Sequence, residues 1–201
     1  MGTPLHDPPR CAAWLHRQAR AGFEVAFFRA DAEGHVLDGS TSAVEDGEAW
    51  NVSYSLTIGP AGATRGARVT SRSVGGPRER VLVADGAGRW WVDGEAAPRL
   101  DGCLDVDLES SACTNALTVR RLRLPVGGRA AAPAAYVRAP GLGVDRLEQD
   151  YVRVADDDLG HQRYDYAAPG LAFACRLVCD RSGLVLEYPG IASRVAVGAP
   201  A

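Results

Sequence analysis

Alternating apolar and polar positions dominate this chain, and the clearest run is WNVSYSLTI at residues 50–58. Side chains along a β-strand point to opposite faces in turn. One face of the run is apolar and consists of Trp50, Val52, Tyr54, Leu56 and Ile58. The other face is polar and consists of Asn51, Ser53, Ser55 and Thr57. The run therefore predicts an antiparallel strand with one buried face, followed by a turn in the glycine-rich GPAGATRG.

The same alternation recurs along the chain, with short turn-forming segments between the runs. Further strands are predicted in FEVAFFRA (23–30), HVLDGSTSAV (35–44), ARVTSRSV (67–74), AAYVRAP (134–140), DRLEQDYVRV (145–154) and HQRYDYAA (161–168). Two hairpins are predicted, in RVLVADGAGRWWVD (80–93) and in LAFACRLVCDRSGLVLEYPG (171–190). In the second hairpin, Gly183 is free to take a left-handed turn conformation.

Helical periodicity is weak. CAAWLHRQAR (11–20) fits either a short helix or the first strand, and Pro133 disfavours a helix in RAAAPAAY (129–136). Strands do not alternate regularly with helices, so we predict a mainly β fold: a single curled, mostly antiparallel sheet of about ten to twelve strands with little helix. Residues 10–196 would form this one domain, and residues 1–9 and 197–201 would be flexible ends.

The stretch DGCLDVDLESSACTNALTVRRLRL (101–124) concentrates the charge. If LDVDLE and ALTVRRLRL form a strand pair, the row Asp105, Asp107 and Glu109 faces arginines across an outer, solvated face. Such exposed ion pairs contribute less than about 1 kcal/mol each. Arg120 falls on the apolar face instead, where it needs a partner or a polar ligand, because an unpaired buried charge is prohibitive.

Composition narrows the possible functions. The net charge is −3, which argues against a nucleic-acid partner, and all 22 basic side chains are arginines. The five cysteines are irregularly spaced, the N-terminal stretch has no apolar core of the signal-peptide type, and no apolar run is long enough to span a bilayer. We therefore expect a cytoplasmic protein with reduced thiols, no transmembrane segment and no metal or other cofactor.

Several segments together resemble the bacterial family of putative glycolipid-binding proteins. They are GRWWVDG, LDGCLDVDLESSACTN, the RRLRL that follows with a glycine pair after it, LEQDYVRV, and GLVLEYPG with SRV, and they span roughly Trp14 to Val195 in the family's order. The resemblance implies one spiral β-roll domain, with an architecture similar to carriers that shuttle lipoproteins across the bacterial periplasm. It also implies a glycolipid or lipid ligand.

A curled sheet can hold the tail of an amphipathic ligand on its concave apolar face, with polar groups around a head group. The preferred head-group contacts are Arg120 and Arg121 together with Asn115, because arginine suits phosphate and carboxylate groups. The alternative for these residues is a structural salt bridge and a turn-capping asparagine. The remaining candidate ligand-binding residues are Trp50, Trp91, Asp105, Asp107 and Tyr151. Trp90 and Trp91 are adjacent, so only one of them should face the core.

Two other functions remain open. Asp105, Asp107 and Glu109 could supply the carboxyl pair of a hydrolase, although Ser110 and Ser111 have no evident histidine partner in the sequence. The curved sheet could instead be a non-catalytic oligomerisation or interaction module. The protein is expected to be a monomer or a homodimer. No catalytic motif stands out, and an enzyme is the less favoured interpretation.

Overall fold

The computed structural model describes residues 5–32 and 34–198. Its strands are β1 (Cys11–His16), β2 (Ala21–Asp31), β3 (Gly34–Glu45), β4 (Glu48–Ile58), β5 (Thr64–Ser73), β6 (Gly76–Ala84), β7 (Trp90–Val92), β8 (Glu95–Ala96), β9 (Asp105–Leu108), β10 (Arg129–Ala131), β11 (Ala134–Val137), β12 (Val144–Leu147), β13 (Asp150–Val154), β14 (Gln162–Ala168), β15 (Phe173–Cys179), β16 (Val185–Tyr188) and β17 (Ala192–Val197). One α-helix, α1 (Asn115–Leu122), and two 3₁₀ turns, Pro98–Leu100 and Pro169–Leu171, complete the described elements.

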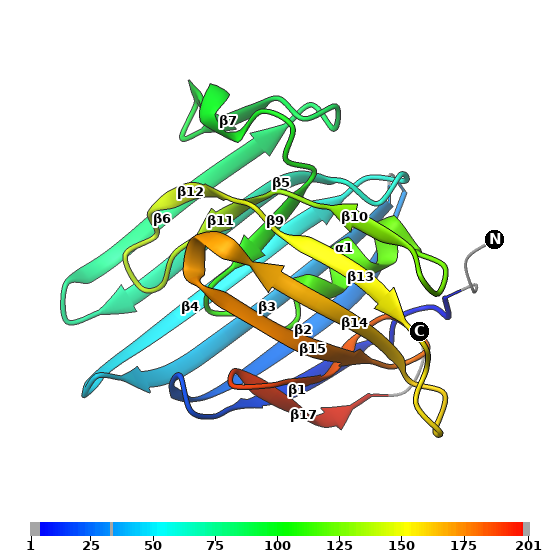
Figure 1. The fold of residues 1–201 in the computed structure, drawn as a ribbon. Helices are drawn as coiled ribbons and strands as arrows, with labels where there is room; N and C mark the ends of the chain where they lie inside the picture. The colour runs from blue at the N-terminus through cyan, green and yellow to red at the C-terminus, as the bar shows by residue number, and fades with distance from the viewer. Residues whose placement is uncertain (1–4, 33, 199–201) are drawn as a thin grey trace.

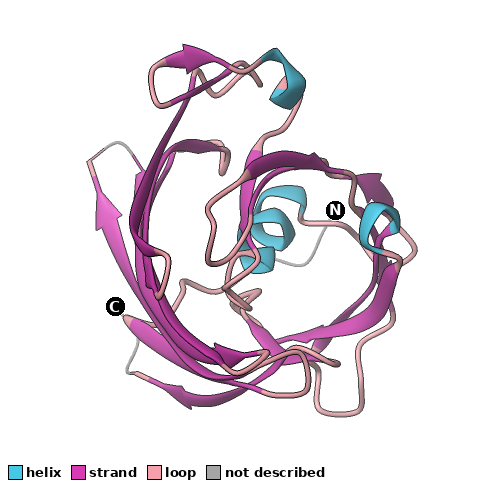
Figure 2. Cartoon of the chain, turned by 90° about the vertical axis from the view of Figure 1, so that its left-hand side faces the viewer, coloured by secondary structure: helices cyan, strands magenta, loops and turns pink. Residues whose placement is uncertain are grey.

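Fourteen strands form one antiparallel sheet in the order β10-β13-β14-β15-β16-β17-β1-β2-β3-β4-β5-β6-β7-β8. The sheet curls without closing into a barrel (Figure 1). Viewed end-on, it wraps around an interior that contains α1 (Figure 2). The mainly β, curled-sheet fold predicted from the sequence is confirmed. The described residues form more strands than predicted, seventeen, because several strands are only two to four residues long.

The run at residues 50–58 lies in β4 as predicted, with its apolar face buried. Tyr54 shows how closely the inner face is packed. Its ring lies directly over Gly39 on β3, where an added Cβ would be only 2.2 Å from the ring. Only a glycine leaves room for the ring at this position, so the inner surface at this point depends on Gly39.

The segment predicted as a strand at residues 116–124 is instead the helix α1, and this corrects the predicted strand pair. Alanine, leucine and arginine favour helices, and their order fits a helix as well as it fits an alternating strand. Arg123 ends the helix in a left-handed conformation with φ 46°. The interpretation of Arg120 as a strand residue beside Leu122 and Leu124 is therefore wrong.

The strand β9 is buried on both faces, so its carboxylates are not on an outer solvated surface as predicted. It pairs in parallel with β11, which pairs with β12, in a separate three-stranded sheet. The helix α1 covers the face of β9 that carries Asp105 and Asp107, as the hydrogen bonds from Thr118 and Thr114 show. Both carboxylates therefore need partners inside the protein.

The two chain ends lie on the same part of the sheet, because β1 pairs with both β2 and β17. The segment CAAWLH is therefore a strand, the second of the two structures that the sequence allowed. The predicted flexible ends fall partly on residues 1–4 and 199–201, which lie outside the described residues. Within the described part, the amide of His6 donates to the carbonyl oxygen of Arg181 at 3.0 Å, which holds the N-terminal segment against the roll.

Candidate functional site

A pocket of about 560 Å³ opens where the N-terminal segment, the turns of β2–β5 and helix α1 meet. Its lining consists of Asp7, Pro8, Phe28, Arg29, Ala30, His35, Val36, Leu37, Ile58, Gly59, Pro60, Ala61, Gly62, Ala116, Leu117, Arg120, Arg121 and Arg123. A second pocket of about 640 Å³ lies across the β4–β5 turn and shares Ile58 to Ala61 with the first. We call the first one the arginine-rimmed pocket.

The inner wall of the arginine-rimmed pocket is apolar. Val36, Leu37 and Ile58 come from the sheet, and Ala116 and Leu117 come from the facing side of α1. All five side chains are buried, so the wall is preformed by the core itself. This combination of an apolar wall with a few polar groups at its edge is typical of small-molecule sites.

The rim of the pocket is basic because α1 ends there with Arg120, Arg121 and Arg123. Arg120 donates through Nη1 to the carbonyl oxygens of His6, at 3.0 Å, and Ser182. Its stem passes over Gly183, where an added Cβ would lie 3.1 Å from the arginine Cγ. Burial is the main cause that lowers the pKa of Arg120, and the charge of Arg123 adds to it.

Arg121 also lines the pocket, but its charge is neutralised. Its Nε donates to Oδ1 of Asp105 at 3.0 Å and its Nη2 donates to Oδ2 at 2.6 Å. Thr118 donates to the same carboxylate at 2.9 Å. Asp105 is therefore held by a two-point contact that is among the stronger ion-pair geometries.

The opposite side of α1 belongs to a closed polar cluster centred on Asp107. The carboxylate accepts hydrogen bonds from Thr114 Oγ1 at 2.8 Å and from Gln149 Nε2 at 2.5 Å. Asn115 Nδ2 donates to the hydroxyl of Tyr151 at 2.9 Å. Burial raises the pKa of Asp107 to about 6, and the two hydrogen bonds only partly oppose this shift.

The structure thus divides the residues predicted from the sequence. Five of them form the closed cluster and the ion pair beside it: Asp105, Asp107, Asn115, Arg121 and Tyr151. Arg120 and Arg121 lie at the arginine-rimmed pocket. Glu109 is directed elsewhere and accepts a hydrogen bond from the amide of Ala139 at 2.8 Å. The predicted row of three carboxylates on one solvated face is therefore not formed.

The two predicted tryptophans lie away from this pocket. Trp50 is buried, with the guanidinium carbon of Arg20 5.2 Å from its ring centroid. Trp91 is 37% exposed, whereas the adjacent Trp90 is buried and donates to the carbonyl oxygen of Cys103 at 2.9 Å. The prediction that only one of the adjacent pair faces the core is correct. A ligand contact by Trp50 or Trp91 stays a prediction.

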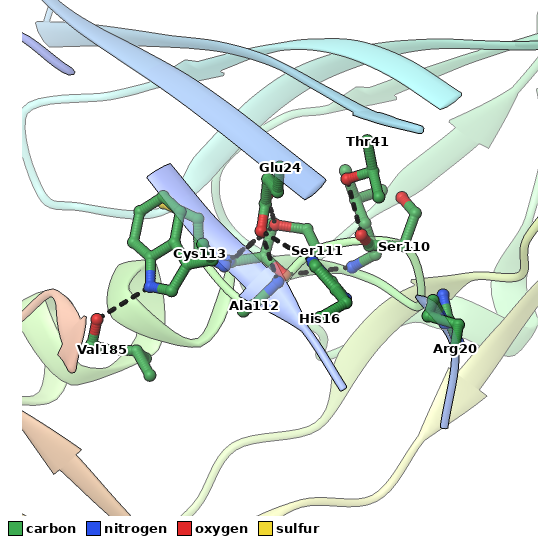
Figure 3. A network of polar contacts seen from close by, with 12 residues as sticks. His16, Arg20, Glu24, Thr41, Ser110, Ser111, Ala112, Cys113 and Val185 are labelled. Carbon is green, nitrogen blue, oxygen red and sulfur yellow. Dashed lines mark hydrogen bonds and ion pairs between the residues drawn. The ribbon is translucent and has the colours of Figure 1, made fainter. Parts of the chain in front are cut away.

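A second buried polar cluster, around Glu24 on β2, was missed by sequence reasoning (Figure 3). The carboxylate accepts hydrogen bonds from Tyr54 at 2.7 Å, from Ser111 at 2.5 Å and from the amide of Ala112 at 2.8 Å. His16 Nε2 lies 3.5 Å from the same carboxylate. The one signal in the sequence is an acidic residue among the apolar residues of FEVAFF (23–28).

The Glu24 cluster brings Ser111 near a histidine, but it lacks the geometry of a nucleophilic triad. Ser111 donates to the glutamate itself, and within residues 5–32 and 34–198 no hydrogen-bond partner is found for either ring nitrogen of His16. His16, Glu24 and Ser111 are all buried. The cluster therefore ties β2 and β4 to the segment that precedes α1.

Two further findings concern the described residues. They contain no group of three or more histidine, cysteine, aspartate or glutamate side chains placed to hold a metal ion. In the same ranges, no helix has both the length and the apolar character needed to cross a membrane.

Comparison with known proteins gives one family and two solved structures. The family model described as putative glycolipid-binding matches residues 11–194. A crystal structure of a DUF1089 family protein from Pseudomonas aeruginosa is 32% identical, with coverage of 97% of this chain and 98% of that one and a TM-score of 0.74. A β-barrel-like protein of the DUF1849 domain of unknown function from Brucella abortus is 11% identical, with coverage of 98% and 99% and a TM-score of 0.54, and it supports the fold alone. No curated protein matches the sequence.

Proposed function

The chain belongs to the putative glycolipid-binding family, and from this premise we propose that it binds the apolar part of an amphipathic lipid or glycolipid in the arginine-rimmed pocket. The single observation that carries the proposal is the pocket itself. The pocket has a volume of about 560 Å³, its wall is apolar, and its polar groups lie at its mouth. This volume is within the usual range of ligand pockets, about 300–1,000 Å³.

The energetics favour a chain-like tail. Each methylene moved from water to the wall formed by Leu37, Ile58 and Leu117 would contribute about 0.8 kcal/mol. No covalent step is needed for this role. The same proposal includes a cytoplasmic location, which the five free thiols support because reduced cysteines are usual there.

A hydrolase built on the acidic row is supported less well. Asp105 is held by Arg121 and Thr118, and Asp107 by Thr114 and Gln149. Neither carboxylate lines the arginine-rimmed pocket, where a substrate could reach it. A general acid or base must lie within hydrogen-bond reach of its substrate, so these residues fit a structural role better.

The binding of a neutral apolar dye, N-phenyl-1-naphthylamine, and its displacement by dodecyl maltoside test the proposal. We expect saturable binding of the dye and its displacement below the micelle concentration. Ala61 is exposed on the β4–β5 turn and lines both pockets, so Ala61→Trp should block the mouth with little strain. The new indole ring should keep about two methylenes of the ligand from being buried in the pocket, which corresponds to roughly tenfold weaker binding.

Ala174→Trp on β15 is the matched control, because Ala174 is also exposed but lies outside both pockets. It should leave dye binding unchanged. Equal loss in both variants, or no saturable binding in the unchanged protein, would reject the proposed pocket function.

A further inference from the structure

The last turn of α1 leaves two guanidinium groups at the pocket without a carboxylate partner. Arg120 donates to the carbonyl oxygens of His6 and Ser182, and Arg123 donates to the carbonyl oxygen of Arg120 at 3.2 Å. Among the described residues, neither arginine forms an ion pair. The neighbouring Arg121 differs, because Asp105 neutralises it. The rim therefore carries two positive charges close together that no ion pair neutralises.

The other charged groups at the pocket do not remove this excess. Arg29 pairs with Asp38 at 3.1 Å, so that pair is neutral as a whole. Asp7 is the one carboxylate among the residues that line the pocket, and it is exposed on the rim. One carboxylate against Arg120 and Arg123 still leaves net positive charge at the mouth.

The environment of Arg120 makes this charge costly for the empty protein. Burial lowers the pKa of Arg120, and the like charge of Arg123 lowers it further. Among the described residues, only its Nη1 is engaged in hydrogen bonds, which leaves Nε and Nη2 as an open edge. That edge is the part of a guanidinium that matches two oxygens of a phosphate or carboxylate.

The position of the charges relative to the apolar wall defines the rest of the ligand. Ala116 and Leu117 lie one turn before Arg120 on α1, Arg123 caps the end of that helix, and all four line the same pocket. A molecule that contacts both sets must carry an anionic group next to an apolar chain. A neutral sugar head would supply no counter-charge to either arginine.

We propose that the ligand is an anionic amphiphile whose phosphate or carboxylate head group binds Arg120 and Arg123 while its chain lies on the wall that contains Leu117. This inference rests on the proposed function, because it specifies the head group of a ligand in the same pocket. It also gives the helix end a binding role in addition to its structural one.

Displacement of N-phenyl-1-naphthylamine by four dodecyl amphiphiles tests the inference. Dodecyl phosphate and laurate carry the two anionic heads, dodecyl maltoside a neutral head, and dodecyltrimethylammonium a cationic head. We expect both anions to bind at least about tenfold more tightly than the maltoside, and the cation to bind most weakly. Raising NaCl from about 0.05 to about 0.5 M should weaken the anions only. The two anionic arms distinguish a phosphate head from a carboxylate head.

Variants assign the preference to named residues. Arg123→Gln removes an exposed side chain whose one side-chain hydrogen bond with the described residues is to the Arg120 carbonyl oxygen, so it should fold normally and lower the anion preference about three- to tenfold. Arg120→Gln combined with it should abolish the preference. Asp7→Asn should strengthen anion binding about twofold, because it removes the opposing rim charge.

The control is Arg72→Gln with Arg78→Gln, which removes two exposed charges from β5 and β6, outside the arginine-rimmed pocket. The anion preference should survive this change. If the control loses the preference as the rim double variant does, the binding reflects general surface charge and the inference is wrong.

The outcomes separate the two proposals. Equal binding of dodecyl phosphate and dodecyl maltoside would overturn the anionic head group but leave the pocket function standing. Failure of every amphiphile to displace the dye would overturn both. The ranking of the four amphiphiles in the unchanged protein shows whether an anionic head group is preferred, even if the Arg120 variant does not fold.

Discussion

The two sides of helix α1 differ in how their charged groups are paired. On the closed side, Asp105 and Asp107 are held by donors from two parts of the chain, residues 114–121 and Gln149. On the open side, all side-chain hydrogen bonds that Arg120 and Arg123 donate to the described residues go to backbone oxygens, and both residues line a pocket. Buried polar groups are normally paired because an unpaired one destabilises the fold. The closed side therefore explains why the helix stays in place, and the open side is where we propose that a ligand binds.

The largest expected effect comes from substituting arginines on the two sides by methionine. Arg121→Met leaves Asp105, which is 1% exposed, as a buried charge without its partner. The expected loss in free energy of unfolding is about 3–5 kcal/mol. Arg123→Met, on the open side, should change it by no more than about 0.5 kcal/mol. Urea unfolding of both variants measures the difference.

A second substitution checks the cause. Adding Asp105→Asn to Arg121→Met removes the orphaned charge, so part of the lost stability should return, as expected for coupled neighbours. A loss below about 1 kcal/mol for Arg121→Met would show that the pair is not an important anchor of the helix.

The two sides also show which parts of the structure could be predicted from the sequence. The alternation of Trp50 to Ile58 is sufficient to predict a buried sheet face, because local periodicity determines which side chains share a face. The alternation at residues 116–124 is misleading, since Ala116, Leu117 and Arg120 also fit a helix and favour one. Local pattern alone cannot decide between the two structures, and here packing against β9 decides it.

Tertiary placement also explains which site residues could be predicted. Asp107, Asn115 and Tyr151 were predicted as ligand contacts, but their polar groups are engaged inside the protein. Asn115 donates to the Tyr151 hydroxyl, and Asp107 accepts from Thr114 and Gln149. Arg120 was selected because a strand would place it on an apolar face. That placement is wrong, since Arg120 lies on α1, and its role as a ligand contact stays a prediction. Glu24 could not be identified as buried, because its partners Tyr54 and Ser111 are 30 and 87 residues away in the chain.

The second prediction concerns pH and the closed side. Burial raises the pKa of Asp107 from 3.8 to about 6, so the folded protein keeps a proton that the unfolded chain has lost between these values. The stability supplied by this group is therefore fully present below about pH 4 and is lost as the pH rises through about 6. The total change is about 3 kcal/mol.

Asp107→Asn should remove this contribution. The free energy of unfolding of the wild type should therefore fall, relative to that of the variant, as the pH rises from about 4 to about 7. Chemical denaturation at several pH values between about 4 and 7 measures it. Asp145→Asn, at an exposed position on β12, controls for the loss of a negative charge. Parallel curves for wild type and Asp107→Asn would contradict the buried position of this carboxylate.

The smallest expected effect tests a single hydroxyl on the closed side, where Asn115 Oδ1 is buried without a hydrogen-bond partner among the described residues. Tyr151 is buried, and its hydroxyl accepts a hydrogen bond from Asn115 at 2.9 Å. Tyr151→Phe leaves that amide without a partner, so we expect a loss of about 1–2 kcal/mol in the free energy of unfolding. Tyr136→Phe is the matched control, because the Tyr136 hydroxyl makes no hydrogen bond within the described ranges, and it should lose no more than about 0.5 kcal/mol.

Dye binding at the open side should be unchanged in both variants, since neither tyrosine lines the arginine-rimmed pocket. If Tyr151→Phe weakened binding without destabilising the fold, the two sides of α1 would not be separate in function, and Tyr151 would have to be restored as a ligand contact.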